Sequence, residues 1–125
     1  MTHAHNQTIL LAEDDGNARE ITAMVLEAEG YRVLTSSNGS AALDILLHDV
    51  SIDLLLSDIN MPGGIDGIEL AQRARKHRPM PIMLISGNPR ASFEHFPDDV
   101  TFLPKPYDRR GLLGAVNGAL HTTAM

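Results

Sequence analysis

The sequence predicts an α/β domain in which a doubly wound parallel sheet of five strands carries helices on both faces. Short aliphatic runs alternate with segments of helical periodicity, five times over. A chain of 125 residues has the length of one ordinary domain. Its hydrophobic fraction of 43% and its charged fraction of 21% are those of a folded globular protein with a core.

The expected strands are apolar throughout, which is typical of strands covered on both faces. They are predicted over Thr8–Ala12, Tyr31–Thr35, Ile52–Ser57, Pro81–Ile85 and Val100–Leu103. Helices are predicted over about 18–28, 39–48, 68–77 and 109–120, and the first has Ala18, Ile21, Val25 and Ala28 at helical spacing. Parallel strands in such folds place ligands beyond their carboxyl ends. That edge of the sheet is therefore where we look for chemistry.

Composition excludes several classes of function. The formal charge of −6, from 10 Lys+Arg against 16 Asp+Glu, disfavours binding to nucleic acid. The absence of cysteine excludes disulfides and thiolate chemistry. No apolar run approaches the roughly 20 residues of a membrane span, and the polar residues 1–7 do not form a secretory signal. A cytoplasmic protein without a membrane partner is expected.

Charged and polar residues stand at the ends of the expected strands. Glu13-Asp14-Asp15 follow the first strand, Asp58 the third and Ser86 the fourth, and the fifth runs into Lys105. Carboxylates that converge on one edge repel one another and raise each other's pKa values. A hard cation such as Mg²⁺ relieves this repulsion. An amine and a hydroxyl opposite the acids suit phosphoryl oxygens, so phosphoryl transfer is the chemistry predicted here.

Taken in order, these motifs resemble bacterial two-component receiver domains over nearly the whole chain, from Thr8 to about Leu120. Asp58-Ile59-Asn60-Met61-Pro62 resembles the phosphorylation motif of that family, and Asp66-Gly67 resembles its continuation. The resemblance implies a flavodoxin-like sheet of order 2-1-3-4-5. It also implies a receiver domain over residues 8–121, preceded by a polar tail of residues 1–7 and followed by no output domain.

The resemblance assigns a chemical role to each residue of the site. Asp58 is implied to be the nucleophile that takes a phosphoryl group from a phosphohistidine. The resemblance implies an Mg²⁺ or Mn²⁺ site, with Asp14 a direct ligand, Glu13 acting through water, and Asp58 and the backbone carbonyl of Asn60 completing it. Lys105 is implied to contact the phosphoryl group from the opposite side.

The resemblance also implies a switch. Ser86 matches the hydroxyl that turns toward the phosphoryl group, and Phe102 matches the aromatic that then rotates. The changed surface is expected over the fourth helix, fifth strand and fifth helix. Asn60 and Asn88, two residues past Asp58 and Ser86, match positions that tune the lifetime of the phosphorylated state. The Lys105-Pro106 bond is expected to be cis, as in relatives.

The implied partners are a histidine kinase or a histidine phosphotransfer protein, and a downstream protein target. By this interpretation the chain is not an enzyme on external substrates and catalyses only its own phosphorylation and dephosphorylation. A metal-dependent phosphatase and a degenerate scaffold are the alternatives. Phosphatases with an aspartate nucleophile place a second Asp where this chain has Asn60, and a scaffold does not need the full set of site residues.

Two segments depart from the family pattern. The loop Met61–Gly67 is one residue longer than the commonest form, and its Pro-Gly-Gly sequence is similar to that of receivers in hybrid kinases. Between Gly87 and Val100, Pro89 and Pro97 leave at most about two helical turns. We therefore expect a short or distorted fourth helix. Partly exposed phenylalanines there, Phe93 and Phe96, are expected to select an unusual partner.

The last helix has two kinds of face. Leu113, Val116 and Leu120 are expected to point toward the core, and the outer face is expected to carry Gly111, Gly114, Ala115 and Gly118. Two interpretations stay open. In the first, the small residues let a partner helix or a second copy approach closely, and a second copy would give a homodimer through this helix. In the second, the glycines simply weaken the helix.

Overall fold

The computed structural model describes residues 7–49 and 51–121, and residues 1–6 of the predicted polar tail lie outside this part. The sheet is parallel with the order β2-β1-β3-β4-β5, which confirms the predicted fold class. Its strands are β1 Thr8–Ala12, β2 Arg32–Ser36, β3 Ile52–Asp58, β4 Ile82–Ser86 and β5 Thr101–Pro104. The helices are α1 Gly16–Ala28, α2 Gly39–His48, α3 Gly67–His77 and α4 Arg109–His121.

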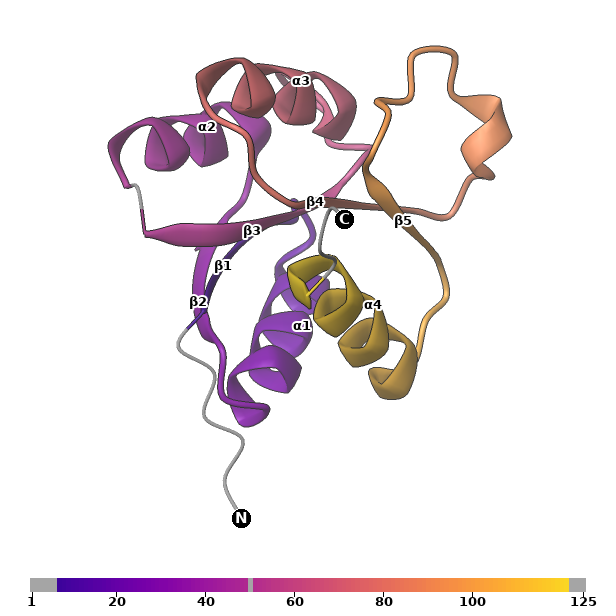
Figure 1. Ribbon diagram of the computed structural model, residues 1–125. Helices are drawn as coiled ribbons and strands as arrows, with labels where there is room; N and C mark the ends of the chain where they lie inside the picture. The colour runs from indigo at the N-terminus through magenta and orange to yellow at the C-terminus, as the bar shows by residue number, and fades with distance from the viewer. Residues whose placement is uncertain (1–6, 50, 122–125) are drawn as a thin grey trace.

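Helices lie on both faces of the sheet, with α1 and α4 on one face and α2 and α3 on the other (Figure 1). Successive strand residues point to opposite faces. Ile9 and Leu11 of β1 therefore join the core beside α1 and α4, while Leu10 and Ala12 join the core beside α2 and α3. Two cores explain why the central strands are apolar throughout.

β1 has the predicted bounds, and the other four strands end slightly later than the sequence predicts. β2, β4 and β5 each begin and end one residue further on, and β3 includes Asp58. Hydrogen bonding of the backbone continues past the apolar residues: Glu13 N–H donates to the Ser36 carbonyl at 3.0 Å, and Lys105 N–H to the Ser86 carbonyl at 2.9 Å. Polar side chains at the strand ends are thus held by the sheet itself.

The helical spacing of apolar residues does not mark the buried face of α1. Thr22 and Leu26 are its buried residues, whereas Ile21 is 62% exposed and Met24 61% exposed. The helix forms where its spacing predicts, but one of its buried positions carries a threonine, which is polar.

On α4, Val116 is buried and the half-buried Leu113 and Leu120 pack against the core, as predicted. The prediction missed Leu112, which is also buried. Ala115 packs against the core rather than facing outward. Gly111, Gly114 and Gly118 are exposed, as predicted. Within the described part of the chain, no helix has the length and apolar character that crossing a membrane requires.

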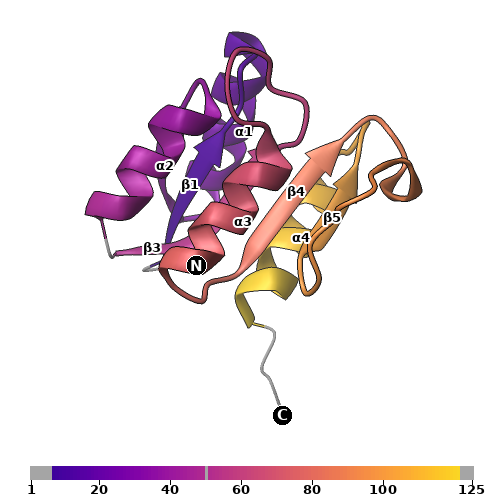
Figure 2. The same ribbon diagram turned by 90° about the horizontal axis from the view of Figure 1, so that it is seen from above.

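The fourth helix of the family pattern is reduced to a single turn. Residues 87–100 contain only the 3₁₀ turn Arg90–Ser92, which confirms the expected short or distorted helix. In Figure 2, α2 and α3 lie on the near face of the sheet, and on this face no helix lies over β5, behind which α4 is seen. Phe93 and Phe96 are half-buried and pack against the core on this face. Two aromatic side chains therefore replace a helix as its cover.

The loop between β3 and α3 depends on its glycines. Gly63 has φ +85°, in the region that favours glycine. Gly67 opens α3 directly against the end of β3. A Cβ at Gly67 would lie 2.3 Å from the carbonyl oxygen of Asp58, so only glycine fits.

Gly67→Ala is expected to lower the free energy of unfolding by about 1–3 kcal/mol, because the methyl group forces α3 away from β3. Gly114→Ala is the matched control: nothing lies within 4 Å of the new methyl group. This substitution should raise the free energy of unfolding by about 0.5–1 kcal/mol, from helix propensity alone. Urea unfolding measures both. Equal stability of the two variants would contradict the close approach of α3 to β3.

Candidate functional site

The carboxyl ends of four neighbouring strands bring the predicted site residues to one edge of the sheet. In the register of the sheet, Ala12 pairs with Ser57, Asp58 with Ile85 and Ser86 with Pro104. Residues that lie at or just after these positions are therefore neighbours. Glu13, Asp58, Ser86 and Lys105 meet in this way although they are distant in sequence.

Three carboxylates form the acidic part of the site. Glu13, Asp14 and Asp58 each offer an oxygen, and these oxygens lie within 4.8 Å of one another. Glu13 and Asp58 are each only 6% exposed, and Asp14 is exposed. Such a group of oxygen donors could hold a hard divalent cation. We therefore identify this edge of the sheet as a candidate metal site.

Asp15 does not belong to this group, contrary to the expectation that all three acids after β1 converge. Its carboxylate accepts a hydrogen bond from the backbone N–H of Ala18 at 3.1 Å and caps α1. An aspartate immediately before a helix is a known capping signal. The sequence could therefore have separated Asp15 from the two acids before it.

Lys105 brings the positive charge of the site. Its Nζ lies 2.9 Å from Oδ1 of Asp58 and 3.7 Å from Oε1 of Glu13. The lysine side chain is 35% exposed, so one ammonium group at the mouth of the site faces two buried carboxylates. The predicted opposition of acids and lysine is thus present in the structure.

Burial dominates the electrostatics of the acids. Burial raises the pKa of Asp58, and the charge of Asp14 adds to this, against the hydrogen bond and charge of Lys105. Burial likewise raises the pKa of Glu13. Burial lowers the pKa of Lys105, but the hydrogen bond and charge of Asp58 outweigh it and raise that pKa overall. At Asp58 the effect of burial on the pKa outweighs the attraction of the lysine, whereas at Lys105 the carboxylates outweigh the effect of burial.

The Ser86 hydroxyl is engaged by two asparagines. It donates to Oδ1 of Asn60 at 3.2 Å and accepts from the backbone N–H of Asn88 at 3.0 Å. Ser86 is fully buried, and the two asparagines are exposed. Sequence reasoning gave Asn60 and Asn88 roles of their own but missed that both bind the same hydroxyl.

Phe102 contacts a second aromatic ring in the segment between β4 and β5. Its half-buried ring meets the ring of Phe96 edge-on, with centroids 5.7 Å apart and planes at 73°. The guanidinium carbon of Arg90 lies 4.5 Å from the centroid of Phe96, a cation–π contact. The sequence gave no signal for these contacts, which depend on the path of the segment 87–100.

Arg19 is a further residue that the sequence did not single out. Its Nη1 donates to the backbone carbonyl of Glu13 at 2.8 Å, which ties the acidic loop to the first turns of α1. The spacing of residues in the sequence does not predict such a hydrogen bond from a side chain to the backbone.

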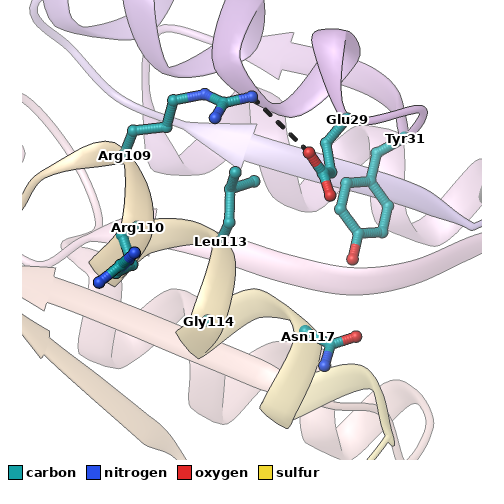
Figure 3. A pocket seen from close by; sticks show the side chains of 7 residues that line it. All are labelled: Glu29, Tyr31, Arg109, Arg110, Leu113, Gly114 and Asn117. Atoms are coloured by element: carbon teal, nitrogen blue, oxygen red, sulfur yellow. Dashed lines mark ion pairs between the residues drawn. The ribbon is translucent and has the colours of Figure 1, made fainter. Parts of the chain in front are cut away.

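A separate hollow of ≈ 540 Å³ lies between α4 and the end of α1 (Figure 3). Arg109 and Glu29 form an ion pair of 3.7 Å across it, and Tyr31 and Asn117 also line it. None of the clustered carboxylates reaches this hollow. It is therefore distinct from the candidate site at the sheet edge.

Comparison with known proteins points to one family. The sequence model of the response regulator receiver domain matches residues 9–117. The response regulator receiver protein CpdR of Brucella abortus is 40% identical over 119 residues, which cover 90% of this chain and 95% of CpdR. The transcriptional regulatory protein CpxR of Escherichia coli is 33% identical over 90% of this chain. The chain spans only 48% of CpxR.

Solved structures give the same result. The receiver domain of the hybrid histidine kinase CckA superposes with a TM-score of 0.78 at 40% identity, covering 91% of this chain and 99% of that domain. A response regulator receiver protein from Sinorhizobium medicae superposes with a TM-score of 0.86 at 31% identity, covering 93% and 95% of the two chains.

Asp58→Asn is expected to stabilise the metal-free protein at neutral pH. The folded-state pKa of Asp58 is raised, so its ionised form costs stability at neutral pH. This cost vanishes as the pH falls below the pKa of aspartate in the unfolded chain. Urea unfolding in the presence of a chelator should therefore show an advantage of the variant that disappears in acid.

Asp98→Asn, at an exposed aspartate of the β4–β5 segment, is the control and should have little effect at either pH. A variant at Asp58 that is less stable than the wild type at neutral pH would show that the Lys105 pair outweighs the burial of the carboxylate.

Proposed function

This chain belongs to the response regulator receiver domain family, and on that premise we propose that Asp58 accepts a phosphoryl group from a phosphohistidine of a partner protein. One observation supports this most: a buried carboxylate at the end of β3 lies 2.9 Å from the Lys105 ammonium and among the oxygens of Glu13 and Asp14. The chain would thereby act as a signalling module.

Mg²⁺, or Mn²⁺ in its place, fits the donor set of the site. Three carboxylate oxygens within 4.8 Å of one another, two of them buried with raised pKa values, favour a hard cation. Asp14 and Asp58 would hold it directly, with Glu13 through water and the backbone carbonyl of Asn60 completing the protein ligands. When bound, the cation neutralises charge on the acids and on the incoming phosphoryl oxygens.

In the transfer step, a carboxylate oxygen of Asp58 forms a bond to phosphorus while the bond from phosphorus to the histidine nitrogen breaks. The imidazole leaves with the electron pair and takes up a proton. Lys105 would turn from Asp58 to a phosphoryl oxygen and keep its positive charge there. Hydrolysis of the aspartyl phosphate by water would end the signal. Both reactions take place on Asp58, so by this proposal the chain catalyses only its own phosphorylation and dephosphorylation.

A phosphatase of external substrates is less well supported. Such an enzyme needs a general acid beside the nucleophile, and the residue two past Asp58 is Asn60, whose amide oxygen accepts from Ser86. A scaffold that is never phosphorylated is also less well supported. Burying charged groups costs free energy, and a scaffold gives no reason to bring Glu13, Asp58 and Lys105 together.

The partner that donates the phosphoryl group would be a histidine kinase or a histidine phosphotransfer protein. Ile21 and Met24, both largely exposed on α1, offer an apolar surface on the helix that begins beside the acidic loop. A helical phosphodonor that covers these two residues would bring its histidine to the site.

The switch we propose runs through the contact between the rings of Phe102 and Phe96. When the Ser86 hydroxyl leaves Asn60 and Asn88 for the phosphoryl group, Phe102 can move into the space that it vacates. Phe102 then loses its contact with Phe96, and the segment 90–100 is released for a downstream partner. Asn60 and Asn88, which hold the hydroxyl before phosphorylation, would tune the lifetime of the signal.

A homodimer through α4 stays a proposal. A Cβ added at Gly114 or at Gly118 would meet nothing within 4 Å, so the outer face of α4 has room for a neighbour at these positions. Gly114 also lines the hollow beside α1 (Figure 3), where another helix could approach closely. Sedimentation at several concentrations tests this, and a monomer throughout would exclude it.

Acetyl phosphate with Mg²⁺ should add one phosphoryl group to the protein, because the site supplies both nucleophile and cation ligands. Asp58→Asn should abolish the added mass in intact-protein mass spectrometry. Asp98→Asn is the control and should be modified like the wild type. Modification that persists in the Asp58 variant would place the acceptor elsewhere.

Asp14→Ala should weaken Mg²⁺ binding about tenfold or more, since it removes the one exposed oxygen ligand of the cluster. Calorimetric titration measures the affinity, with Asp15→Ala as the matched control, because Asp15 caps α1 and lies outside the cluster. A larger loss of affinity in the Asp15 variant would overturn the assignment.

Amide hydrogen exchange tests the switch. Beryllofluoride with Mg²⁺, which mimics the phosphoryl group, should speed exchange over residues 90–100 while leaving β1 unchanged. Phe96→Ala should show fast exchange in this segment without the mimic, because it removes the same contact. Unchanged exchange over the segment in protein saturated with beryllofluoride would exclude this route.

A further inference from the structure

A part-buried polar contact outside the acidic cluster connects α1 to the segment that carries Lys105. Oγ1 of Thr22 lies 3.0 Å from the hydroxyl oxygen of Tyr107, across 85 positions of sequence. Thr22 is 5% exposed and shares the inner face of α1 with Leu26. A valine at position 22 would fill the same space without a polar group that needs a hydrogen-bond partner. The Thr22 hydroxyl is therefore best explained by its hydrogen bond to Tyr107.

Tyr107 lies two residues beyond Lys105 and packs its half-buried side chain against the core beside α1 and α4. The residues on either side of the lysine, Pro104 and Pro106, are exposed and donate no backbone hydrogen bond. Lys105 itself is held by its backbone N–H, which donates to the Ser86 carbonyl at 2.9 Å. The Tyr107 hydroxyl fixes the other end of this short segment.

The same helix also fixes the acids. Asp15 caps α1, and Arg19 donates to the Glu13 carbonyl at 2.8 Å. Thr22 follows Arg19 by three positions, about one turn along the helix. The acidic loop and the lysine segment are therefore both attached to α1 within two turns.

We propose that the hydrogen bond between Thr22 and Tyr107 is a positioning contact for Lys105. By fixing the lysine segment to α1, it sets the distance of the ammonium from Asp58 and from the phosphoryl group that Asp58 receives. Neither hydroxyl touches the reacting atoms. This inference rests on the proposed phosphoacceptor function and adds two residues to it.

Tyr107→Phe and Thr22→Val each remove one hydroxyl and preserve the shape of the side chain. Each should slow phosphorylation by acetyl phosphate with Mg²⁺ by about three- to tenfold, the size of effect that one hydrogen bond supplies. The double variant should be no slower than either single variant, because both remove the same bond. Additive losses would overturn the pairing.

Lys105→Ala separates positioning from general damage to the fold. In that background Tyr107→Phe should leave the phosphorylation rate unchanged, because there is no ammonium left to position. Equal slowing with and without the lysine would overturn the proposal in favour of a purely structural role. Mg²⁺ affinity should be unaltered in Tyr107→Phe, and a parallel loss of affinity would likewise overturn it.

The outcome for the wild type distinguishes the two levels of inference. Failure of the wild-type protein to take up a phosphoryl group would overturn the phosphoacceptor function and this contact with it. Normal phosphorylation of the wild type together with wild-type rates in Tyr107→Phe would overturn only the positioning role.

Discussion

The structure depends on the burial of negative charge at one edge of the sheet. Glu13 and Asp58 are nearly inaccessible to water, Asp14 stands beside them, and the Lys105 ammonium faces the two buried acids. Burial raises the pKa values of both buried acids, so the lysine does not balance them. Much of the surrounding structure holds these carboxylates in place although they repel one another. Asp15 caps α1, Arg19 binds the carbonyl of Glu13, and backbone hydrogen bonds hold the strand ends. The close approach of α3 at Gly67 fixes the end of β3 that carries Asp58.

The sequence predicted the parallel sheet and the meeting of its charged residues. Apolar strands that alternate with helical segments indicated a parallel sheet whose carboxyl ends share one edge, and the family resemblance added the strand order. The sequence did not predict burial where an apolar residue is exposed or a polar residue is buried. Ile21 is apolar and exposed and Thr22 is polar and buried, so the spacing of apolar residues does not locate the buried face of α1. Asp15 was grouped with its acidic neighbours although its place before a helix made it a cap.

Contacts that depend on the path of a loop were beyond prediction. Pro89 and Pro97 foretold that a full helix does not form between β4 and β5, and the structure has one 3₁₀ turn there. Nothing in the sequence foretold that Phe96 would meet Phe102 or that Arg90 would lie over Phe96. The bond between Thr22 and Tyr107 is similar in kind, since it joins residues 85 positions apart.

The replacement of a helix by a short aromatic-bearing segment over β4 and β5 has a consequence for how this surface changes over evolutionary time. A helix on a sheet is bound to its neighbours by a whole row of side chains, so each substitution on it disturbs several others. Here Phe93 and Phe96 provide the cover, and the exposed residues between them, Glu94 and His95, add nothing to the core. New binding preferences can therefore arise at these positions while the fold beneath stays as it is.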